Sequence, residues 1–398
     1  MALLTRVLRR ATPYLHHTRP ESTVASFTKD EILILLRPPF TNWSNIIREA
    51  EKVVGYPTSF INLRCLLSDE FSNLALYLRK LVGSNHLVMQ TAKNVLYGDT
   101  KNLQPWGLVI SLLSKSVKSS TTPEHVYNQQ RQLAELTEMM RTGHLIHRGI
   151  VNVPFAKRSK STESAIFGNK IAILLGDFLL VTANSMLANL KDPDVLYIVS
   201  TALRDLSESE FFGERDEQNM PLPGKPKKTI EELDISFDTS TIEASDVLGK
   251  PRKEWTTRTV YNGVSLLGRG CQSAMLIGKQ NRDIQNYAYH FGCHVGLAWQ
   301  AATELQRLTS EKGQFCLASA PVLFALEGNP DLYKIIDQAK NDVNDVDYED
   351  LKFNILKTDA IDKTRMLYRD HASKAMAFID NIGRNESTEM IRKLVYTF

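Results

Sequence analysis

The 398-residue sequence has few cysteines and no motif built from them. Its four cysteines, Cys65, Cys271, Cys293 and Cys316, lie too far apart for a CxxC metal or redox motif. Four cysteines in a chain of this length do not indicate a disulfide scaffold either. The cysteine content therefore favours a reducing compartment.

Other features are missing as well. The sequence contains no GxSxG, P-loop, Rossmann fingerprint or Cys/His nucleophile pair. Beyond residue 20 it carries 44 basic and 45 acidic residues, so this part of the chain is close to neutral. It lacks the excess of basic residues that is typical of nucleic-acid-binding proteins. Even the apolar run 171–190 is interrupted by Asp177, Asn184 and Asn189. We therefore expect no membrane span, and at most peripheral membrane contact.

The first twenty residues differ from the rest of the chain. They contain Arg6, Arg9, Arg10 and Arg19 but no acidic residue, and they lack the continuous apolar core of a secretory signal. This pattern predicts a mitochondrial presequence over residues 1–25, and a disordered basic tail is the alternative. The expected location is the mitochondrial matrix, with association to the inner membrane left open.

Helical periodicity dominates the sequence, and strand-like alternation is scarce. Helices are predicted over 68–83 and 123–149, each with a start signal and a closing glycine. The segment 167–180 is apolar nearly all round, which predicts a helix surrounded by others. Residues 255–320 contain no proline, so long helices fit there too. The fold class is therefore all-α, as a single large helical bundle.

Residues 208–254 break this pattern. The segment is charged, contains several prolines and has little apolar periodicity. It is predicted to be a mobile surface insertion. A docking or regulatory loop is the functional alternative.

One predicted helix carries polar residues at every third position: Glu135, Glu138, Arg141, His144 and His147. The two histidines could ligate a metal, but no carboxylate or thiol completes the set nearby. An exposed helix face is the preferred interpretation.

Three further candidates remain open. His290 and His294 have the spacing that can bind zinc from one helical turn, but without an HExxH glutamate a structural role is preferred. Asp177 lies inside an apolar helix, which predicts either a buried ion pair or the floor of a polar cavity. Lys157 and Arg158 lie in a basic run that could bind a phosphate or simply face solvent.

Several segments resemble the trans-prenyl diphosphate synthases, and the resemblance covers most of residues 45–398. That family reads HDDxxD, RRG and FGNKxAxLxGDxLL in its first half, and GxxxGLAFQxxDDxLD and TxPxLxAL further on. The corresponding segments here are HRGIVN (147–152), KRS (157–159), FGNKIAILLGDFLL (167–180), GCHVGLAWQAATELQR (292–307) and SAPVLFAL (319–326). The resemblance implies the helical isoprenoid synthase fold.

In that family, two aspartate clusters hold Mg²⁺, which neutralises the diphosphate leaving group when an allylic substrate ionises. Both clusters are replaced here. The aligned positions are Arg148, Gly149 and Asn152 in the first cluster, and Thr303, Glu304 and Arg307 in the second. Only Glu304 supplies a carboxylate, and the two arginines oppose metal binding. We expect no catalytic residue, no metal site and no cofactor in this chain.

Part of the family's diphosphate-binding set persists. Lys101 remains, and Lys157 and Arg158 keep the charge of the family's arginine pair. With Arg148 and Gln300, they are predicted to form a remnant diphosphate-binding pocket without metal, one able to take a prenyl diphosphate.

The strongest resemblance is to the second, non-catalytic subunits of heteromeric decaprenyl or solanesyl diphosphate synthases of mitochondria. It implies a structural and regulatory subunit that joins a catalytic, Mg²⁺-binding partner in making the ubiquinone side chain. Two alternatives are a prenyl-lipid or diphosphate binding module, and a metal-independent prenyltransferase that uses Arg148, Glu304 and Asp177. The sequence decides neither the product's chain length nor between a heterodimer and a heterotetramer.

Overall fold

The computed structural model describes residues 43–55, 105–117, 122–153, 160–227, 237, 242–309 and 314–397. All of them belong to one compact unit, Phe40–Phe398. Several predictions lie outside the described residues. These are the presequence at 1–25, the helix at 68–83, and the side chains of Lys101, Lys157 and Arg158.

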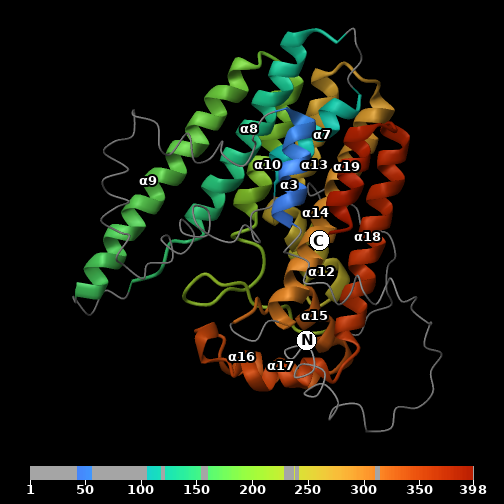
Figure 1. Ribbon diagram of the computed structural model, residues 1–398. Helices are drawn as coiled ribbons and strands as arrows, with labels where there is room; N and C mark the ends of the chain where they lie inside the picture. The colour runs from blue at the N-terminus through green and yellow to red at the C-terminus, as the bar shows by residue number, and fades with distance from the viewer. Residues whose placement is uncertain are drawn as a thin grey trace, which may run out of the picture. The chain divides into compact units, whose positions relative to one another are not determined.

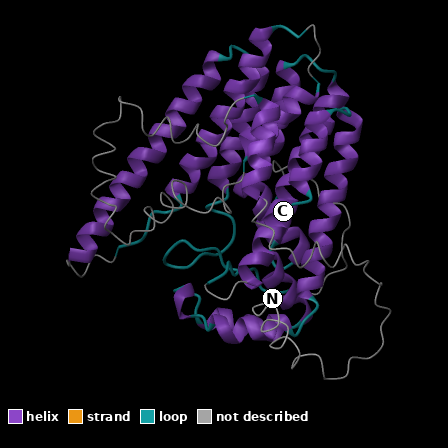
Figure 2. Cartoon of the chain, in the orientation of Figure 1, coloured by secondary structure: helices purple, strands orange, loops and turns teal. Residues whose placement is uncertain are grey.

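Within the described ranges the secondary structure is helical, as predicted (Figure 2), apart from one isolated bridge between Arg215 and Pro221. The longer helices are α8 (Glu124–His147), α9 (Lys160–Asn189), α10 (Pro193–Glu208), α13 (Ser265–Ile277), α14 (Arg282–Thr309) and α18 (Ala360–Ile382). The shorter ones are α3 (Trp43–Val54), α7 (Trp106–Ser116), α11 (Ala244–Val247), α12 (Pro251–Thr259), α15 (Ala320–Gly328), α16 (Tyr333–Gln338), α17 (Tyr348–Leu356) and α19 (Glu386–Val395). Single turns lie at Val260–Val264, Pro330–Leu332 and Val343–Asp345.

The main core lies between α7, α8, α13 and α14, which run side by side in Figure 1. The apolar stripe of α8, Leu133, Leu136 and Met140, is fully buried there. A second core lies below it, where α12 and α15 meet α14 and α18. The predicted helical bundle is therefore confirmed for the described residues, and it is closed by the burial of apolar helix faces.

Helix α9 packs against α8 on one side only. Gly143 and Gly176 let the two helices approach, because a Cβ on Gly143 would lie 3.1 Å from the Gly176 carbonyl oxygen. Its other side exposes Ile166, Ile173, Leu174 and Val181, with exposed fractions of 44–67%. The prediction that this helix is surrounded by others is therefore wrong within the described residues. Figure 1 places α9 at the edge of the bundle.

By length and composition, Ala165–Asn189 within α9 is the one described helix that could cross a membrane. The three polar residues within 171–190 led us to expect no such segment. One face of this helix, including Leu175 and Leu179, is buried against α8 and the core. The apolar composition therefore serves packing on that face, while the other face lies open.

The chain kinks between α12 and α13. At Asn262 and Gly263 the backbone leaves the helical region, and Gly263 has φ +132°. A Cβ at Gly263 would lie 2.5 Å from the Trp106 indole, so only glycine fits there. The kink turns the Asn262 carbonyl away from the helical ladder and makes it available as an acceptor.

The residues Ser209–Lys227, which we call the strap, are packed onto the bundle. Arg258 donates to the carbonyl oxygens of Phe212 (3.0 Å) and Leu222 (2.8 Å). Asp216 accepts from the backbone N–H of Val343 at 2.9 Å. Side chains far away in the sequence therefore bind the backbone of the strap, and the mobility of residues 208–254 stays a prediction.

Candidate functional site

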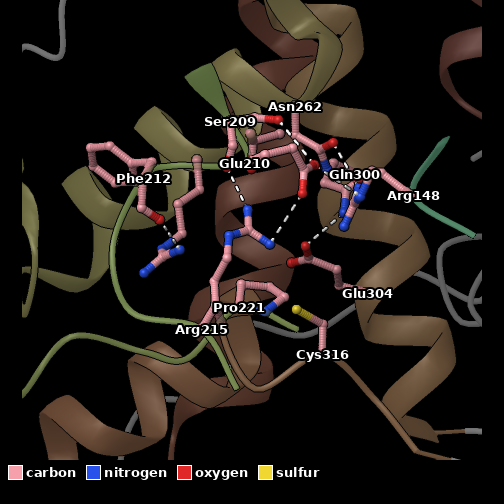
Figure 3. A pocket seen from close by; sticks show the side chains of 13 residues that line it. Arg148, Ser209, Glu210, Phe212, Arg215, Pro221, Asn262, Gln300, Glu304 and Cys316 are labelled. Carbon is pink, nitrogen blue, oxygen red and sulfur yellow. Dashed lines mark hydrogen bonds and ion pairs between the residues drawn. The ribbon is translucent and has the colours of Figure 1, made fainter. Parts of the chain in front are cut away.

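A pocket lies where the end of α8, the Asn262 kink, α14 and the strap meet (Figure 3). We call it the arginine pocket. Its lining consists of Arg148, Ser209, Glu210, Phe212, Arg215, Pro221, Arg258, Thr259, Asn262, Gln300, Glu304, Cys316 and Ala318. Three guanidinium groups and two carboxylates thus face one cavity.

Arg148 caps the C-terminal end of α8, where the backbone turns away from the helix. Its Nη1 donates to the side-chain oxygen of Asn262 at 2.7 Å. Arg141, about two turns earlier, donates to the Asn262 backbone oxygen at 2.7 Å and stacks over Trp106. The helix kink therefore holds two arginines through one residue.

The strap places Glu210 between two guanidinium groups. Oε1 of Glu210 lies 3.4 Å from Nε of Arg148, and Oε2 lies 3.4 Å from Nη1 of Arg215. Asn219 also donates to Glu210 Oε2 at 2.9 Å. In Figure 3 the Glu210 carboxylate points between Arg148 and Arg215. An internal anion thus neutralises part of the pocket's positive charge.

A second position of the first cluster also binds the strap. The backbone N–H of Asn152 donates to Gln218 Oε1 at 3.0 Å, and Gln218 Nε2 donates back to the Asn152 carbonyl at 3.3 Å. The Asn152 side-chain amide donates to the Glu217 carbonyl. Gly149, between the two positions, is buried in the turn that follows α8. Arg148 and Asn152, which stand where the family has aspartates, thus both bind the strap.

Glu304, the one carboxylate in the second cluster, is fully engaged. It accepts from Trp255 Nε1 at 2.7 Å, from the Ala320 backbone N–H at 2.8 Å and from Gln300 Nε2 at 2.7 Å. Burial raises the pKa of Glu304, although these three donors act in the opposite direction. The carboxylate joins α12, α14 and α15, so its role is structural.

The remaining positions of that cluster lie away from the cavity. Arg307 is exposed, and neither Arg307 nor Thr303 lines the arginine pocket. Of the two arginines at the cluster positions, only Arg148 therefore lines the cavity. The other two arginines that line it, Arg215 and Arg258, lie outside the clusters.

Of the predicted diphosphate-binding set, Arg148 and Gln300 meet in the arginine pocket. Asp177 does not join them. Its side chain is 61% exposed, and its Oδ1 lies 3.4 Å from Nε2 of His147 at the end of α8. The prediction of a buried polar group is wrong, because α9 lies at the edge of the bundle and this position is exposed.

The helix face predicted to be exposed is largely buried. Glu138, Arg141 and His144 are each less than 10% exposed. Burial raises the pKa of Glu138 to about 7, lowers that of Arg141 to about 9 and lowers that of His144 to about 3. Glu138 accepts from the Gly107 backbone N–H at 2.6 Å. The prediction of an exposed face is wrong because Glu138 and Arg141 bind backbone groups inside the bundle.

His290 and His294, one helical turn apart, both stack on the ring of Phe378. Nδ1 of His294 also lies 2.9 Å from Nδ1 of His371. Burial lowers the pKa of both His294 and His371 to about 3. The described residues contain no group of three or more potential metal ligands. Two neutral histidines sharing one proton fit this contact.

Sequence reasoning missed Glu210, Arg215 and Arg258 as pocket residues. All three lie in or just after the segment predicted to be a mobile insertion. Arg258 pairs with Glu254 at 2.9 Å one helical turn away, which is the only local signal among them. The contacts that bring Glu210 to Arg148 join residues 62 positions apart and leave no local pattern.

Comparison with known proteins agrees with this fold. A family model described as polyprenyl synthetase matches residues 86–350. All trans-polyprenyl-diphosphate synthase PDSS2 of Mus musculus is 33% identical over 371 residues, which cover 89% of this chain and 86% of that protein. A probable mitochondrial hexaprenyl pyrophosphate synthase of Yarrowia lipolytica is 25% identical over 447 residues, covering 94% of this chain and 93% of that protein.

The crystal structure of heptaprenyl diphosphate synthase from Staphylococcus aureus matches with a TM-score of 0.56 at 19% identity, covering 82% of this chain and 96% of that one. At this identity the match concerns the fold alone, and it confirms the predicted isoprenoid synthase type. The family model spans more than half of the chain, and the mouse relative is more than 30% identical over most of its own length. The chain belongs to the polyprenyl synthetase family.

Proposed function

We propose that this chain is a non-catalytic, structural and regulatory subunit of a heteromeric trans-polyprenyl diphosphate synthase that makes the ubiquinone side chain. Its catalytic partner would carry both aspartate clusters and the Mg²⁺. One observation carries the proposal: the cavity where metal clamps would face each other is lined by three arginines and by two carboxylates that already have partners.

The residues present do not fit Mg²⁺. This ion requires near-octahedral oxygen ligands and usually one or two carboxylates. Glu304 accepts three hydrogen bonds, and Glu210 lies between Arg148 and Arg215. A divalent cation would have to displace these donors beside guanidinium groups of the same charge. The pocket therefore favours anions over metal ions.

The same geometry weakens the alternative of a metal-independent prenyltransferase. That alternative relies on Glu304 and Asp177 as its carboxylates. Glu304 is held by Trp255, Ala320 and Gln300, and Asp177 is exposed on α9. Neither side chain is positioned to move a proton in the cavity.

The open face of α9 supports a partner subunit. Ile166, Ile173, Leu174 and Val181 follow a spacing of seven, one and seven residues, which places them in one stripe along the helix. The exposed Lys170 and Asp177 lie in the same stripe, so it matches a helix that offers apolar contacts and charged groups together. The occupant we propose is the catalytic, aspartate-bearing subunit of the same family, because its helices would supply such contacts. Exposed stripes of this kind mark protein interaction sites.

The mitochondrial matrix is the proposed location. The basic, acid-free start of the sequence supports it, as do relatives named as mitochondrial in Yarrowia lipolytica and Neurospora crassa.

The test is to express the chain with and without a polyprenyl synthetase family member from the same organism that carries both aspartate clusters. Each chain alone and the co-purified mixture are assayed with an allylic diphosphate, isopentenyl diphosphate and Mg²⁺. We expect long-chain product from the mixture and none from this chain alone. Long-chain synthesis by the lone chain would refute the proposal, as would failure of the two to co-purify. Native mass spectrometry gives the composition of the complex.

A further inference from the structure

The end of the strap and the start of α12 carry the same short basic motif. Residues 224–227 read GKPK and residues 249–252 read GKPR, and the second copy is followed by Lys253. Residues 224–227 and 249–253, which we call the twin motif, contain five basic residues and no acidic residue. We propose that the twin motif is a docking surface for an anionic phospholipid membrane. The inference goes beyond the proposed function, because it requires neither the partner subunit nor the arginine pocket.

One buried carboxylate holds the two copies together. Glu254 is fully buried, and its Oε1 accepts from the Gly224 backbone N–H at 2.9 Å while its Oε2 accepts from the Gly249 backbone N–H at 2.7 Å. The Lys227 backbone N–H donates to the Gly249 carbonyl oxygen at 2.9 Å. Arg258, 2.9 Å from Glu254, balances the charge of this carboxylate. The first glycine of each copy thus binds the same side chain, and the two basic segments lie against each other.

The backbone of the twin motif leaves little freedom to move. Gly249 has φ +82°, and a Cβ there would overlap the Lys225 carbonyl oxygen. Pro226 and Pro251 follow the first lysine of each copy and restrict the chain further. The lysines are therefore presented from a fixed scaffold, which lowers the entropy lost when they meet a surface.

Cations outnumber carboxylates in this part of the molecule. The basic side chains of the twin motif are exposed at the first two positions and half-buried at the other three: Lys225, Lys227, Lys250, Arg252 and Lys253. Arg252 and Lys374 share one carboxylate, that of Asp370, at 2.9 and 3.0 Å. Among the described residues between the two copies, the acidic ones are Glu243 and Asp246. Six cations thus stand against three carboxylates, and the surface stays positive.

The composition of the surface fits a membrane better than a protein or a nucleic acid. None of the large exposed hydrophobic side chains of the described residues lies in the twin motif. It therefore lacks the aromatic anchors of a protein interface and the stacking rings of a site for single-stranded nucleic acid. Clusters of four or more lysines and arginines are attracted to anionic headgroups, and each contributes about fivefold in affinity. Lysine suits this role because it acts as a point charge that needs no fixed partner geometry.

The test is sedimentation of the full chain with phosphatidylcholine vesicles, prepared with and without phosphatidylglycerol. We expect binding to the vesicles that contain phosphatidylglycerol, much weaker binding to the neutral ones, and a loss of affinity as the salt concentration rises. A fourfold variant then changes the lysines of the twin motif: Lys225→Gln, Lys227→Gln, Lys250→Gln and Lys253→Gln. Its affinity for the anionic vesicles should fall by more than about a hundredfold.

The matched control makes the same change of charge at exposed lysines outside the twin motif: Lys52→Gln, Lys279→Gln, Lys334→Gln and Lys340→Gln. It should bind within about threefold of the wild type, because charges away from the contact are screened. The basic first twenty residues are the same in every variant, so the comparison isolates the twin motif. Should the fourfold variant fold poorly by thermal melting, the double variant Lys225→Gln/Lys227→Gln changes only the two exposed positions and should lose about 25-fold.

Equal affinities of the fourfold variant and the control for anionic vesicles would overturn the inference. Equal binding of the wild type to neutral and anionic vesicles would overturn it as well. If the fourfold variant loses binding to duplex DNA or to polyglutamate but keeps its affinity for the vesicles, the surface serves another class of partner and the inference is wrong. The assay uses the lone chain and no substrate, so its failure leaves the co-purification and activity results intact.

Discussion

Trp255 and Glu304 are joined by a buried hydrogen bond of 2.7 Å from the indole Nε1 to the carboxylate Oε2. The same oxygen accepts from the Ala320 backbone N–H. A position that aligns with a metal-binding aspartate therefore ties α12 to α14 and α15. In this chain the second cluster has become part of the scaffold, which explains how one carboxylate can persist without a metal to bind.

Replacing Glu304 with alanine should destabilise the fold strongly. The change leaves the Trp255 indole, the Ala320 N–H and the Gln300 amide without their acceptor in a buried site. We expect the free energy of unfolding to fall by about 3 kcal/mol, measured by urea denaturation. Glu304→Gln keeps the shape and one acceptor oxygen, so it should lose less than half as much. Equal losses in both variants would show that the charge itself, and not the acceptor, is required.

The helical framework could be predicted because it rests on local pattern. Thr122 and Pro123 precede α8, and its apolar stripe of Leu133, Leu136 and Met140 is buried as the period of the helix requires. The positions of Arg148 and Gln300 in one pocket could be predicted from motif spacing within the family. Both conclusions depend on residues close together in the sequence or on a fold already known.

The rest depends on contacts that sequence does not display. An apolar helix buried in a core and one that exposes a stripe to a partner have the same composition, so the open face of α9 and the exposure of Asp177 were not predictable. The low apolar content of the strap led to the prediction of a mobile segment. In the structure, Arg258 and Asn152 donate hydrogen bonds to its backbone. Such hydrogen bonds between distant residues leave no periodic signal.

The open face of α9 yields a prediction about assembly. Val181→Arg places a charge in the exposed apolar stripe, where the side chain is now 67% exposed. The fold of the lone chain should be unaffected, but co-purification with the catalytic subunit should be lost, because burying an unpaired charge at an interface is costly. Phe353→Arg on α17 is the control, since Phe353 is 60% exposed outside this stripe. An intact complex with Val181→Arg would place the interface elsewhere.

Gly263→Ala should disrupt the kink that holds both arginines. Gly263 has φ +132°, a conformation that costs other residues about 1–3 kcal/mol, and the added Cβ would meet Trp106. We expect the melting temperature to fall by several degrees for a loss of about 2 kcal/mol. Gly328→Ala should be nearly neutral, because its nearest neighbour would be 3.9 Å away and its φ is not positive. Similar melting temperatures for the two variants would contradict the role of the kink.

Three buried histidines make the fold sensitive to acid. Burial lowers the pKa of His144, His294 and His371 to about 3, against an ordinary value of 6.5. Below pH 6.5 these histidines bind protons in the unfolded chain but not in the folded chain. The free energy of unfolding therefore decreases as the pH falls from 6.5 towards 3. Each histidine contributes about 1.4 kcal/mol per pH unit in that window. Glu138 and Glu304 act with the opposite sign, because burial raises the pKa of Glu138 to about 7 and raises that of Glu304 as well, so both favour the folded state as the pH falls.

The sum of these effects can be measured. Between pH 4.5 and 6.5, Glu138 and Glu304 offset part of the histidine contribution, and below pH 4.5 these two carboxyl groups no longer oppose the histidines. Urea unfolding at pH 7.5, 6.0, 5.0, 4.5, 4.0 and 3.5 should therefore show a decline that steepens at the acidic end. His371→Gln removes one buried titrating group and should reduce the slope below pH 4.5 by about a third, whatever its effect on absolute stability. The control His125→Gln alters an exposed histidine and should leave the slope unchanged. An unchanged slope in His371→Gln would mean that the buried pair with His294 is not the source of the acid sensitivity.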